Sequence, residues 1–136
     1  MNNSDLIKAA LVARKMSYSP YSDFSVGAAL LCNDGSVFTG CNIENSAFSP
    51  TNCAERTAFF KAVSEGKRDF LRIVVVGGEA SEETPLNYCP PCGVCRQVMK
   101  EFCSSDFEIL IAKTPDDYKI LTLSELLPLS FDKREV

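Results

Sequence analysis

Three cysteines and one glutamate are the residues of this sequence whose types and spacing could support a chemical reaction. Cys92 and Cys95 form a C-x-x-C pair in the stretch PPCGVCRQ, and Cys53 lies two residues before Glu55 in the stretch NCAER. Zn²⁺ binds cysteine thiolates in tetrahedral sites, and a site with three protein ligands keeps a fourth position for water. A glutamate beside that water can act as general base and acid. The pattern therefore indicates a metal-assisted hydrolysis.

The first half of this candidate site lies at the start of a predicted helix, at about residues 52–65. Asn52 is a suitable N-cap, Glu55 completes a pattern like a capping box, and Gly66 can end the helix. At the third helical position, Glu55 could curl back over the N-terminus and reach a metal-activated water. The alternative is that Glu55 only caps its helix.

The second half lies at the start of another predicted helix, at about residues 92–102, which Pro90 and Pro91 introduce. Two cysteines three residues apart in a first turn project their sulfurs to one side. If both helix N-termini point at one place, they bring three thiols together beside the positive ends of two helix dipoles. Such an environment favours thiolate over thiol.

The remaining elements must hold these two helix starts together. Apolar residues at helical spacing predict a first helix at about 4–17, and a capping-box pattern from Thr122 to Glu125 predicts a short last helix. Apolar runs predict five strands: two in SVGAALLCNDGSVFTGC, joined by a tight turn at 33–35, and one each in FLRIVVVGG, FEILIA and YKILT. The order α-β-β-α-β-α-β-β-α predicts an α/β fold, with a mixed sheet of about five strands and helices on its faces.

The composition of the chain limits the function classes. A length of 136 residues, 46% of them hydrophobic, predicts one globular domain over 1–136. The net charge of −4 and the pI of about 4.8 argue against a nucleic-acid partner. The apolar runs are too short to span a bilayer, so no membrane partner is expected. The N-terminus lacks the features of a signal peptide, and a cytoplasmic location is expected.

The seven cysteines and the absence of histidine narrow the chemistry further. In a cytosolic chain, clustered cysteines more often bind metal or react than form disulfides. Without histidine, the chain cannot use a Ser-His-Asp or Cys-His nucleophile system, nor an imidazole zinc ligand.

The stretches NCAERTA (52–58) and PCGVCRQ (91–97) together resemble the paired signature of the small homotetrameric, zinc-dependent cytidine deaminases. The resemblance extends through YSPYSDFSVGAALL, GCNIENSAFSP, FKAVSEG and ELLPLSF, so it covers most of the chain. It implies a three-layer α/β/α fold and one Zn²⁺ per subunit, held by Cys53, Cys92 and Cys95. It also implies hydrolytic deamination of cytidine and deoxycytidine in pyrimidine salvage.

The same resemblance implies roles for the residues around the metal. Glu55 would be the proton shuttle, which protonates N3 of cytosine while water attacks C4 and then passes a second proton to the departing amino group. Three thiolates leave the zinc site with a net negative charge, which opposes activation of the water. Arg56, which in the family hydrogen-bonds the ligand sulfurs, would offset that charge. The implied substrate-binding residues are Asn42 and Glu44 for the ribose, Phe24 for the pyrimidine ring, the backbone of Ala54 for the base edge, and Phe131 from a neighbouring subunit.

Without the resemblance, the substrate-binding side chains have simpler interpretations. Asn42 and Glu44 would be turn residues, Phe24 would be part of the core, and Phe131 would pack on its own chain.

Two residues depart from the family pattern. Phe48 stands where the family commonly carries tyrosine, so any contact made by that hydroxyl is lost. Cys89 forms a second C-x-x-C pair with Cys92. Because Pro90 and Pro91 separate Cys89 from the helix, we expect it to be a spare thiol.

Three other function classes remain open. A structural zinc module would recruit Cys89 as a fourth ligand and would have no activity. A thioredoxin-like redox role for Cys92 and Cys95 would leave NCAER unexplained. A deaminase of this type could instead act on another substrate, such as a nucleoside antibiotic or a base within RNA. The acidic pI disfavours RNA, and the lack of a glycine-rich phosphate motif favours a free nucleoside over a nucleotide.

Overall fold

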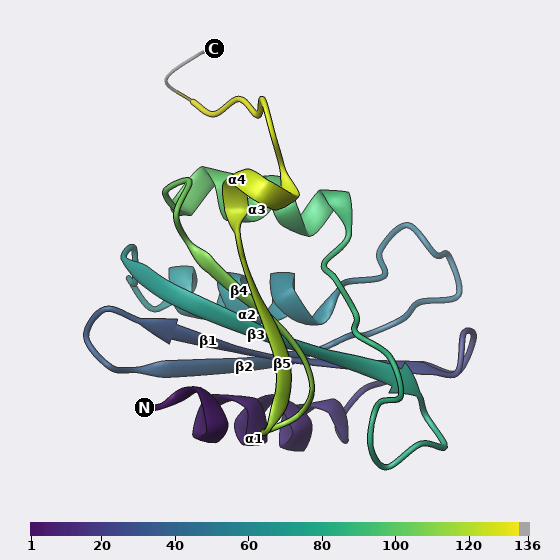
Figure 1. Cartoon of the computed structure of the whole chain (residues 1–136). Helices are drawn as coiled ribbons and strands as arrows, with labels where there is room; N and C mark the ends of the chain where they lie inside the picture. Colours follow the sequence, from purple (N-terminus) through teal and green to yellow (C-terminus); the bar gives the residue numbers. More distant parts are fainter. Residues whose placement is uncertain (134–136) are drawn as a thin grey trace.

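The computed structural model describes residues 1–133, which form four helices and five strands (Figure 1). The last three residues of the predicted domain, 134–136, lie outside the described residues. The elements are α1 (Asn3–Arg14), β1 (Phe24–Cys32), β2 (Val37–Cys41), α2 (Ala54–Ser64), β3 (Phe70–Glu79), α3 (Gly93–Phe102), β4 (Glu108–Thr114), β5 (Asp117–Thr122) and α4 (Leu123–Leu126). Their order is the one that the sequence predicts. No described helix is long and apolar enough to cross a membrane.

The five strands form one mixed sheet in the order β2-β1-β3-β4-β5. Only the central β3–β4 pair is parallel, and the other three pairs are antiparallel. Helix α1 covers one face, while α2, α3 and α4 lie on the other (Figure 1). Each face has its own buried apolar cluster, one including Leu6 and Val74 and the other including Phe59 and Ile109. The prediction of an α/β fold with helices on both faces is confirmed.

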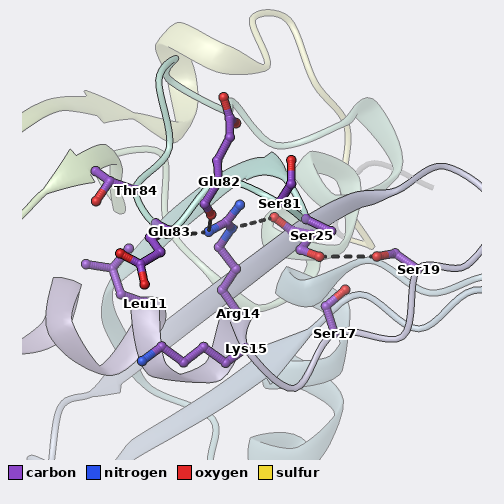
Figure 2. A pocket seen from close by; sticks show the side chains of 11 residues that line it. Leu11, Arg14, Lys15, Ser17, Ser19, Ser25, Ser81, Glu82, Glu83 and Thr84 are labelled. Carbon is purple, nitrogen blue, oxygen red and sulfur yellow. Dashed lines mark hydrogen bonds between the residues drawn. The ribbon is translucent and has the colours of Figure 1, made fainter.

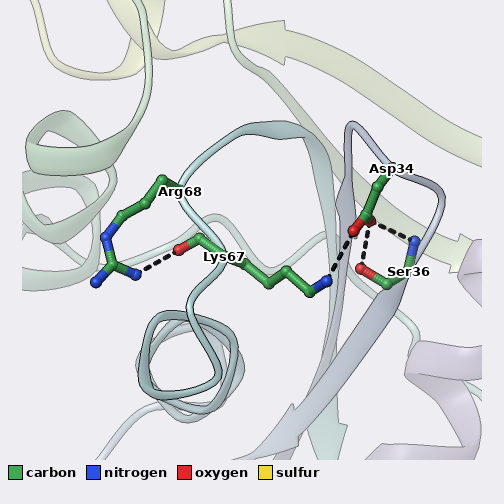
Figure 3. A network of polar contacts seen from close by, with 4 residues as sticks. All are labelled: Asp34, Ser36, Lys67 and Arg68. Carbon is green, nitrogen blue, oxygen red and sulfur yellow. Dashed lines mark hydrogen bonds and ion pairs between the residues drawn. The ribbon is translucent and has the colours of Figure 1, made fainter.

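The turn between β1 and β2 shows why Asp34 and Gly35 stand there. Gly35 has a φ of 89°, which side chains other than glycine rarely adopt. The Asp34 carboxylate accepts hydrogen bonds from the backbone N–H and the hydroxyl of Ser36 and pairs with Lys67 Nζ at 2.7 Å (Figure 3). This ion pair ties the hairpin to the connection between α2 and β3. Its contribution to stability is small because Asp34 is exposed to solvent.

The start of α2 differs from its prediction. The N-cap is Cys53 rather than Asn52, and it has no side-chain cap. The backbone of Asn52 instead exchanges two hydrogen bonds of 2.9 Å with Ile43, and this bridge keeps the chain extended at that point. Glu55 is therefore the second helical residue rather than the third, and the capping-box prediction is wrong. The predicted capping box of α4, formed by Thr122 and Glu125, is confirmed.

The two other helix boundaries near the site are close to their predictions. Helix α1 ends at Arg14, three residues earlier than predicted, and the chain then turns to a bridge between Tyr18 and Ile43. Helix α3 begins at Gly93 with Cys92 as its N-cap.

The start of α2 lies unusually close to the sheet. A Cβ atom added to Gly40 of β2 would lie 2.4 Å from the carbonyl oxygen of Ala54. Only glycine permits this approach. The first residue of α2, and with it Cys53, is therefore held against the edge strand.

Arg14 joins the end of α1 to two other parts of the fold. Its guanidinium donates to the carbonyl oxygens of Ser25 at 2.9 Å and Glu82 at 2.8 Å (Figure 2). It also donates to the carbonyl oxygens of Glu79 at 2.7 Å and Glu83 at 3.5 Å. The residue is only 6% exposed. One buried cation thus fixes the beginning of β1 and the loop that follows β3.

Candidate active site

The three cysteines singled out in the sequence lie together at the N-termini of α2 and α3. Their Sγ atoms are all within 4.8 Å of one another, and those of Cys53 and Cys92 are 3.7 Å apart. Cys53 and Cys92 are the N-cap residues of the two helices, and Cys95 lies in the first turn of α3. Neither N-cap side chain bonds its own helix, so both thiols are available to another partner.

This arrangement fits a tetrahedral zinc site. With a Zn–S distance of about 2.3 Å, neighbouring sulfurs of a tetrahedron are about 3.8 Å apart. The Cys53–Cys92 separation of 3.7 Å agrees with that value. The donor set also suits zinc, because thiolate is one of its preferred ligands.

The electrostatics of the cluster favour a thiolate at Cys53. A hydrogen bond from the Cys95 thiol and a second from Arg56 lower the pKa of Cys53 to about 5, although burial opposes them. The same bond from its thiol to Cys53, together with burial, raises the pKa of Cys95. The cluster thus carries negative charge at neutral pH.

Arg56 is a cation in direct contact with this charge. Its Nη2 donates to Cys53 Sγ at 3.3 Å. Burial would lower the pKa of Arg56, but its hydrogen bonds to the sulfurs of Cys53 and Cys95 raise it. Its Nε is buried and has no hydrogen-bond partner among the described residues. The hydrogen bonds of the Arg56 guanidinium therefore go to the thiol cluster and not to the backbone of the fold.

Glu55 is a buried carboxyl beside the thiols, with 4% of its surface exposed. Burial raises the pKa of Glu55 to about 7, and the nearby charge of Cys53 adds to the effect. A carboxyl with this pKa is partly protonated at neutral pH, which suits a group that takes up and releases protons.

The sequence-predicted ribose residues make contacts within the protein. Glu44 Oε1 accepts hydrogen bonds from the backbone N–H groups of Tyr21 at 3.0 Å and Ser22 at 3.2 Å, and its Oε2 accepts one from the Ser22 hydroxyl. The hydroxyl contact is the largest cause that lowers the pKa of Glu44. Glu44 also borders a cavity of about 380 Å³ whose other lining residues include Phe48. An ionised carboxylate therefore faces an open space.

Asn42 is more buried, with 9% of its surface exposed. Its Oδ1 accepts hydrogen bonds from Val26 N at 2.9 Å and from Ser17 Oγ, and its Nδ2 donates to the Phe24 carbonyl at 2.8 Å. The last bond uses one of the two hydrogens of Nδ2. Asn42 thus fixes the beginning of β1, where Phe24 is one-third exposed.

Ala54 and Phe131 lie at opposite extremes of burial. Ala54 is fully buried in the first turn of α2, and Phe131 is 58% exposed in the segment after α4. That segment lies on the side of α3 and α4 that faces away from the sheet (Figure 1). In this chain the ring of Phe131 is therefore not part of either apolar cluster.

Cys89 lies outside the group of three thiols. Its Sγ is directed at β3, where a Cβ added to Gly77 would be 2.7 Å from it. Burial raises the pKa of Cys89 to about 11, so it stays protonated at neutral pH. The described residues that could hold a metal are Cys53, Cys92 and Cys95, without Cys89.

Sequence reasoning missed the residues that hold Asn42 and Glu44, the two residues predicted to bind the ribose. Ser17 contacts Asn42, and Tyr21 and Ser22 contact Glu44. These pairs are 22 to 25 residues apart in the chain, and no spacing pattern marks them. A larger cavity, of about 630 Å³, lies beside Arg14 and is lined by no cysteine (Figure 2). Cavity size alone would have pointed away from the chemistry.

Comparison with known proteins gives consistent results. Residues 1–111 match the family model of the cytidine and deoxycytidylate deaminase zinc-binding region. The chain is 50% identical to a cytidine deaminase of Halalkalibacterium halodurans, over 100% of this chain and 98% of that one. It is 48% identical to a cytidine deaminase of Sporosarcina psychrophila, over 100% and 96%. The crystal structure of a cytidine deaminase from Burkholderia pseudomallei superposes with a TM-score of 0.87 at 44% identity, over 96% and 100% of the two chains.

Proposed function

The chain belongs to the cytidine and deoxycytidylate deaminase family, and from that premise we propose how its own residues carry out the reaction. The protein is a zinc-dependent cytidine deaminase, which hydrolyses the C4 amino group of cytidine to give uridine and ammonia. We propose that one catalytic domain over residues 1–136 carries this activity.

Cys53, Cys92 and Cys95 hold the zinc ion in this proposal. The single observation that carries it is the position of their three sulfurs within 4.8 Å of one another. When bound, zinc would act as a Lewis acid and activate water for attack on C4 of the base. Arg56 offsets the negative charge of the thiolates through its hydrogen bond to Cys53.

Glu55 holds and moves the protons. Its carboxyl is shielded from bulk water, and burial gives it a pKa of about 7. It can therefore take up, one after the other, the two protons that the attacking water gives up, and deliver the first to N3 of the base and the second to the departing amino nitrogen.

The substrate is a free pyrimidine nucleoside, cytidine or deoxycytidine. Phe24 packs on the base, and the backbone of Ala54 reads the base edge. Asn42 and Glu44 hold the ribose: Glu44 is ionised and accepts from a ribose hydroxyl, while Asn42 has a second Nδ2 hydrogen to donate. A carboxylate at this end of the site disfavours a phosphate group by repulsion.

The active enzyme is a homotetramer whose sites are shared between subunits. Phe131 covers the substrate of a neighbouring subunit, which is consistent with its 58% exposure in its own chain. Covering the bound nucleoside buries more of its surface and so contributes to substrate binding. We place the enzyme in the cytoplasm, in pyrimidine salvage.

The test of the proposed function combines activity with metal content. Purified protein is incubated with cytidine, and the loss of absorbance is followed with and without a zinc chelator. We expect turnover that the chelator abolishes and added zinc restores. Metal analysis should give one zinc per chain, and Cys53→Ser, Cys92→Ser and Cys95→Ser should each lose it. Retention of zinc by all three variants would overturn the ligand assignment.

A further inference from the structure

The segment after α4, residues 127–132, is held along α3 from its beginning. Arg96 Nη1 donates to the Leu126 carbonyl oxygen at 2.7 Å, while its Nε donates to the Pro91 carbonyl oxygen, also at 2.7 Å. One guanidinium thus joins the end of α4 to the residue before Cys92. We call residues 127–132 the C-terminal segment.

A turn then brings the C-terminal segment back toward α3. Leu129 has a φ of 54° and its side chain is fully exposed. Residues other than glycine rarely adopt this backbone conformation, and those that do are usually held in it by the surrounding structure. Contacts on both sides of Leu129 are therefore needed to maintain the turn.

After the turn at Leu129, the C-terminal segment is held by two more residues of α3. Gln97 Nε2 donates to the carbonyl oxygen of Phe131 at 3.2 Å. Lys100 Nζ, one helical turn farther on, lies 4.0 Å from Asp132 Oδ2. The side chains of Lys100 and Asp132 are 11% and 6% exposed, so this pair is largely shielded from solvent. Charges shielded in this way interact more strongly than those of an exposed pair.

The burial of Asp132 also sets the direction of Phe131. Asp132 faces α3, whereas its neighbours Phe131 and Lys133 are exposed. The backbone of Phe131 is fixed by Gln97, and its ring is turned to solvent. The contacts of Gln97, Lys100 and Asp132 thus support the C-terminal segment and leave the ring of Phe131 exposed. We call these three residues the support.

We propose that Gln97, Lys100 and Asp132 are positioning residues for substrate binding, because they hold Phe131 in place on α3. This inference rests on the proposed function, in which Phe131 covers the substrate of a neighbouring subunit. A ring held in advance loses less conformational entropy when substrate binds than a ring on a loose segment does. Loss of the support therefore weakens substrate binding and leaves the chemical step unchanged.

The experiment measures kcat and KM for cytidine in Gln97→Glu, Lys100→Ala and Asp132→Asn, with Phe131→Ala beside them. We expect KM to rise by about threefold to tenfold in the three support variants, with kcat unchanged. The double exchange Lys100→Asp with Asp132→Lys should recover much of the wild-type KM. Lys8→Ala, an exposed lysine on the opposite face of the sheet, is the matched control. Zinc content and molecular mass are measured for every variant.

The outcomes separate the inference from the function on which it rests. If Phe131→Ala raises KM and the support variants do not, the support is overturned and the shared site stands. If Phe131→Ala leaves KM unchanged, the role of Phe131 in the neighbouring site fails, and the support role fails with it. If the support variants lose zinc or dissociate, they act on the fold or assembly, and the positioning role is overturned.

Discussion

Two arginines of this molecule show how a region that builds the fold differs from a region that awaits a ligand. Arg14 directs its guanidinium at four backbone carbonyl oxygens, and the chain itself satisfies it. Arg56 donates to a sulfur, and its buried Nε has no hydrogen-bond partner among residues 1–133. Buried polar groups are nearly always paired in folded proteins. An unpaired donor beside three thiols therefore marks the functional region better than cavity size does.

The largest effect on activity is expected at Glu55, the buried carboxyl beside the three thiols. Glu55→Gln should lower kcat by about 10²- to 10⁴-fold, because proton transfer by a positioned carboxyl accounts for about that factor. Zinc content should stay at one per chain, and the melting temperature should not fall, since the variant removes a buried ionisable group. Steady-state kinetics and metal analysis on the same preparation test this. Near-normal turnover would leave Glu55 with a structural role only.

The next effect is expected at the structural arginine. Arg14→Ala should lower the free energy of unfolding by about 3 kcal/mol or more, because it leaves buried carbonyl oxygens without donors. The turnover of the zinc-loaded protein at low temperature should be unchanged. Calorimetry and kinetics at one protein concentration measure the two quantities. The neighbouring Lys15→Ala, at an exposed position, is the control. If Arg14→Ala lost turnover without losing stability, Arg14 would not have the purely structural role that distinguishes it from Arg56.

Arg56 should show the opposite behaviour. Arg56→Gln should lower zinc affinity by about 10- to 100-fold, the range found when partners of metal ligands are removed. The metal-free protein should lose less stability than Arg14→Ala loses. Competition with a chromogenic chelator measures the affinity, and the exposed Arg68→Gln serves as the control. Unchanged zinc affinity would contradict the assignment of Arg56 to the thiolates.

The smallest effect is expected at the cysteine outside the cluster. Cys89→Ser should keep one zinc per chain, because the Cys89 thiol faces Gly77 and stays protonated. Cys95→Ser, with the same change inside the cluster, should lose the metal. Metal analysis of the two variants decides between an open site of three ligands and a closed site of four. Loss of zinc from Cys89→Ser would favour the closed, structural site.

The sequence was sufficient for the order of the elements and for the place of the thiols. Apolar periodicity marks each strand and helix, and the two prolines before Cys92 place the start of a helix at a C-x-x-C pair. Local patterns of this kind depend on residues that are near one another in the chain.

The features that were missed depend on residues far apart in the chain. Asn52 has the local properties of an N-cap, but its backbone pairs with Ile43, and the helix starts one residue later. Arg14 and its partner Glu82 are 68 residues apart. No motif in the sequence marks either contact, because each arises only when the sheet brings separate segments together.

The close packing of Gly40 against Ala54 has a consequence for how sequence variation in this chain should be interpreted. Gly40 lies in an edge strand, and in the sequence it is 13 residues before Cys53. Any side chain there would press on the carbonyl of Ala54, 2.4 Å from its Cβ, and would push the first turn of α2 away from the sheet. A substitution at Gly40 is thus an active-site substitution in its effect. A ranking of variants by their distance in sequence from Cys53 would wrongly treat this change as a neutral one in an edge strand.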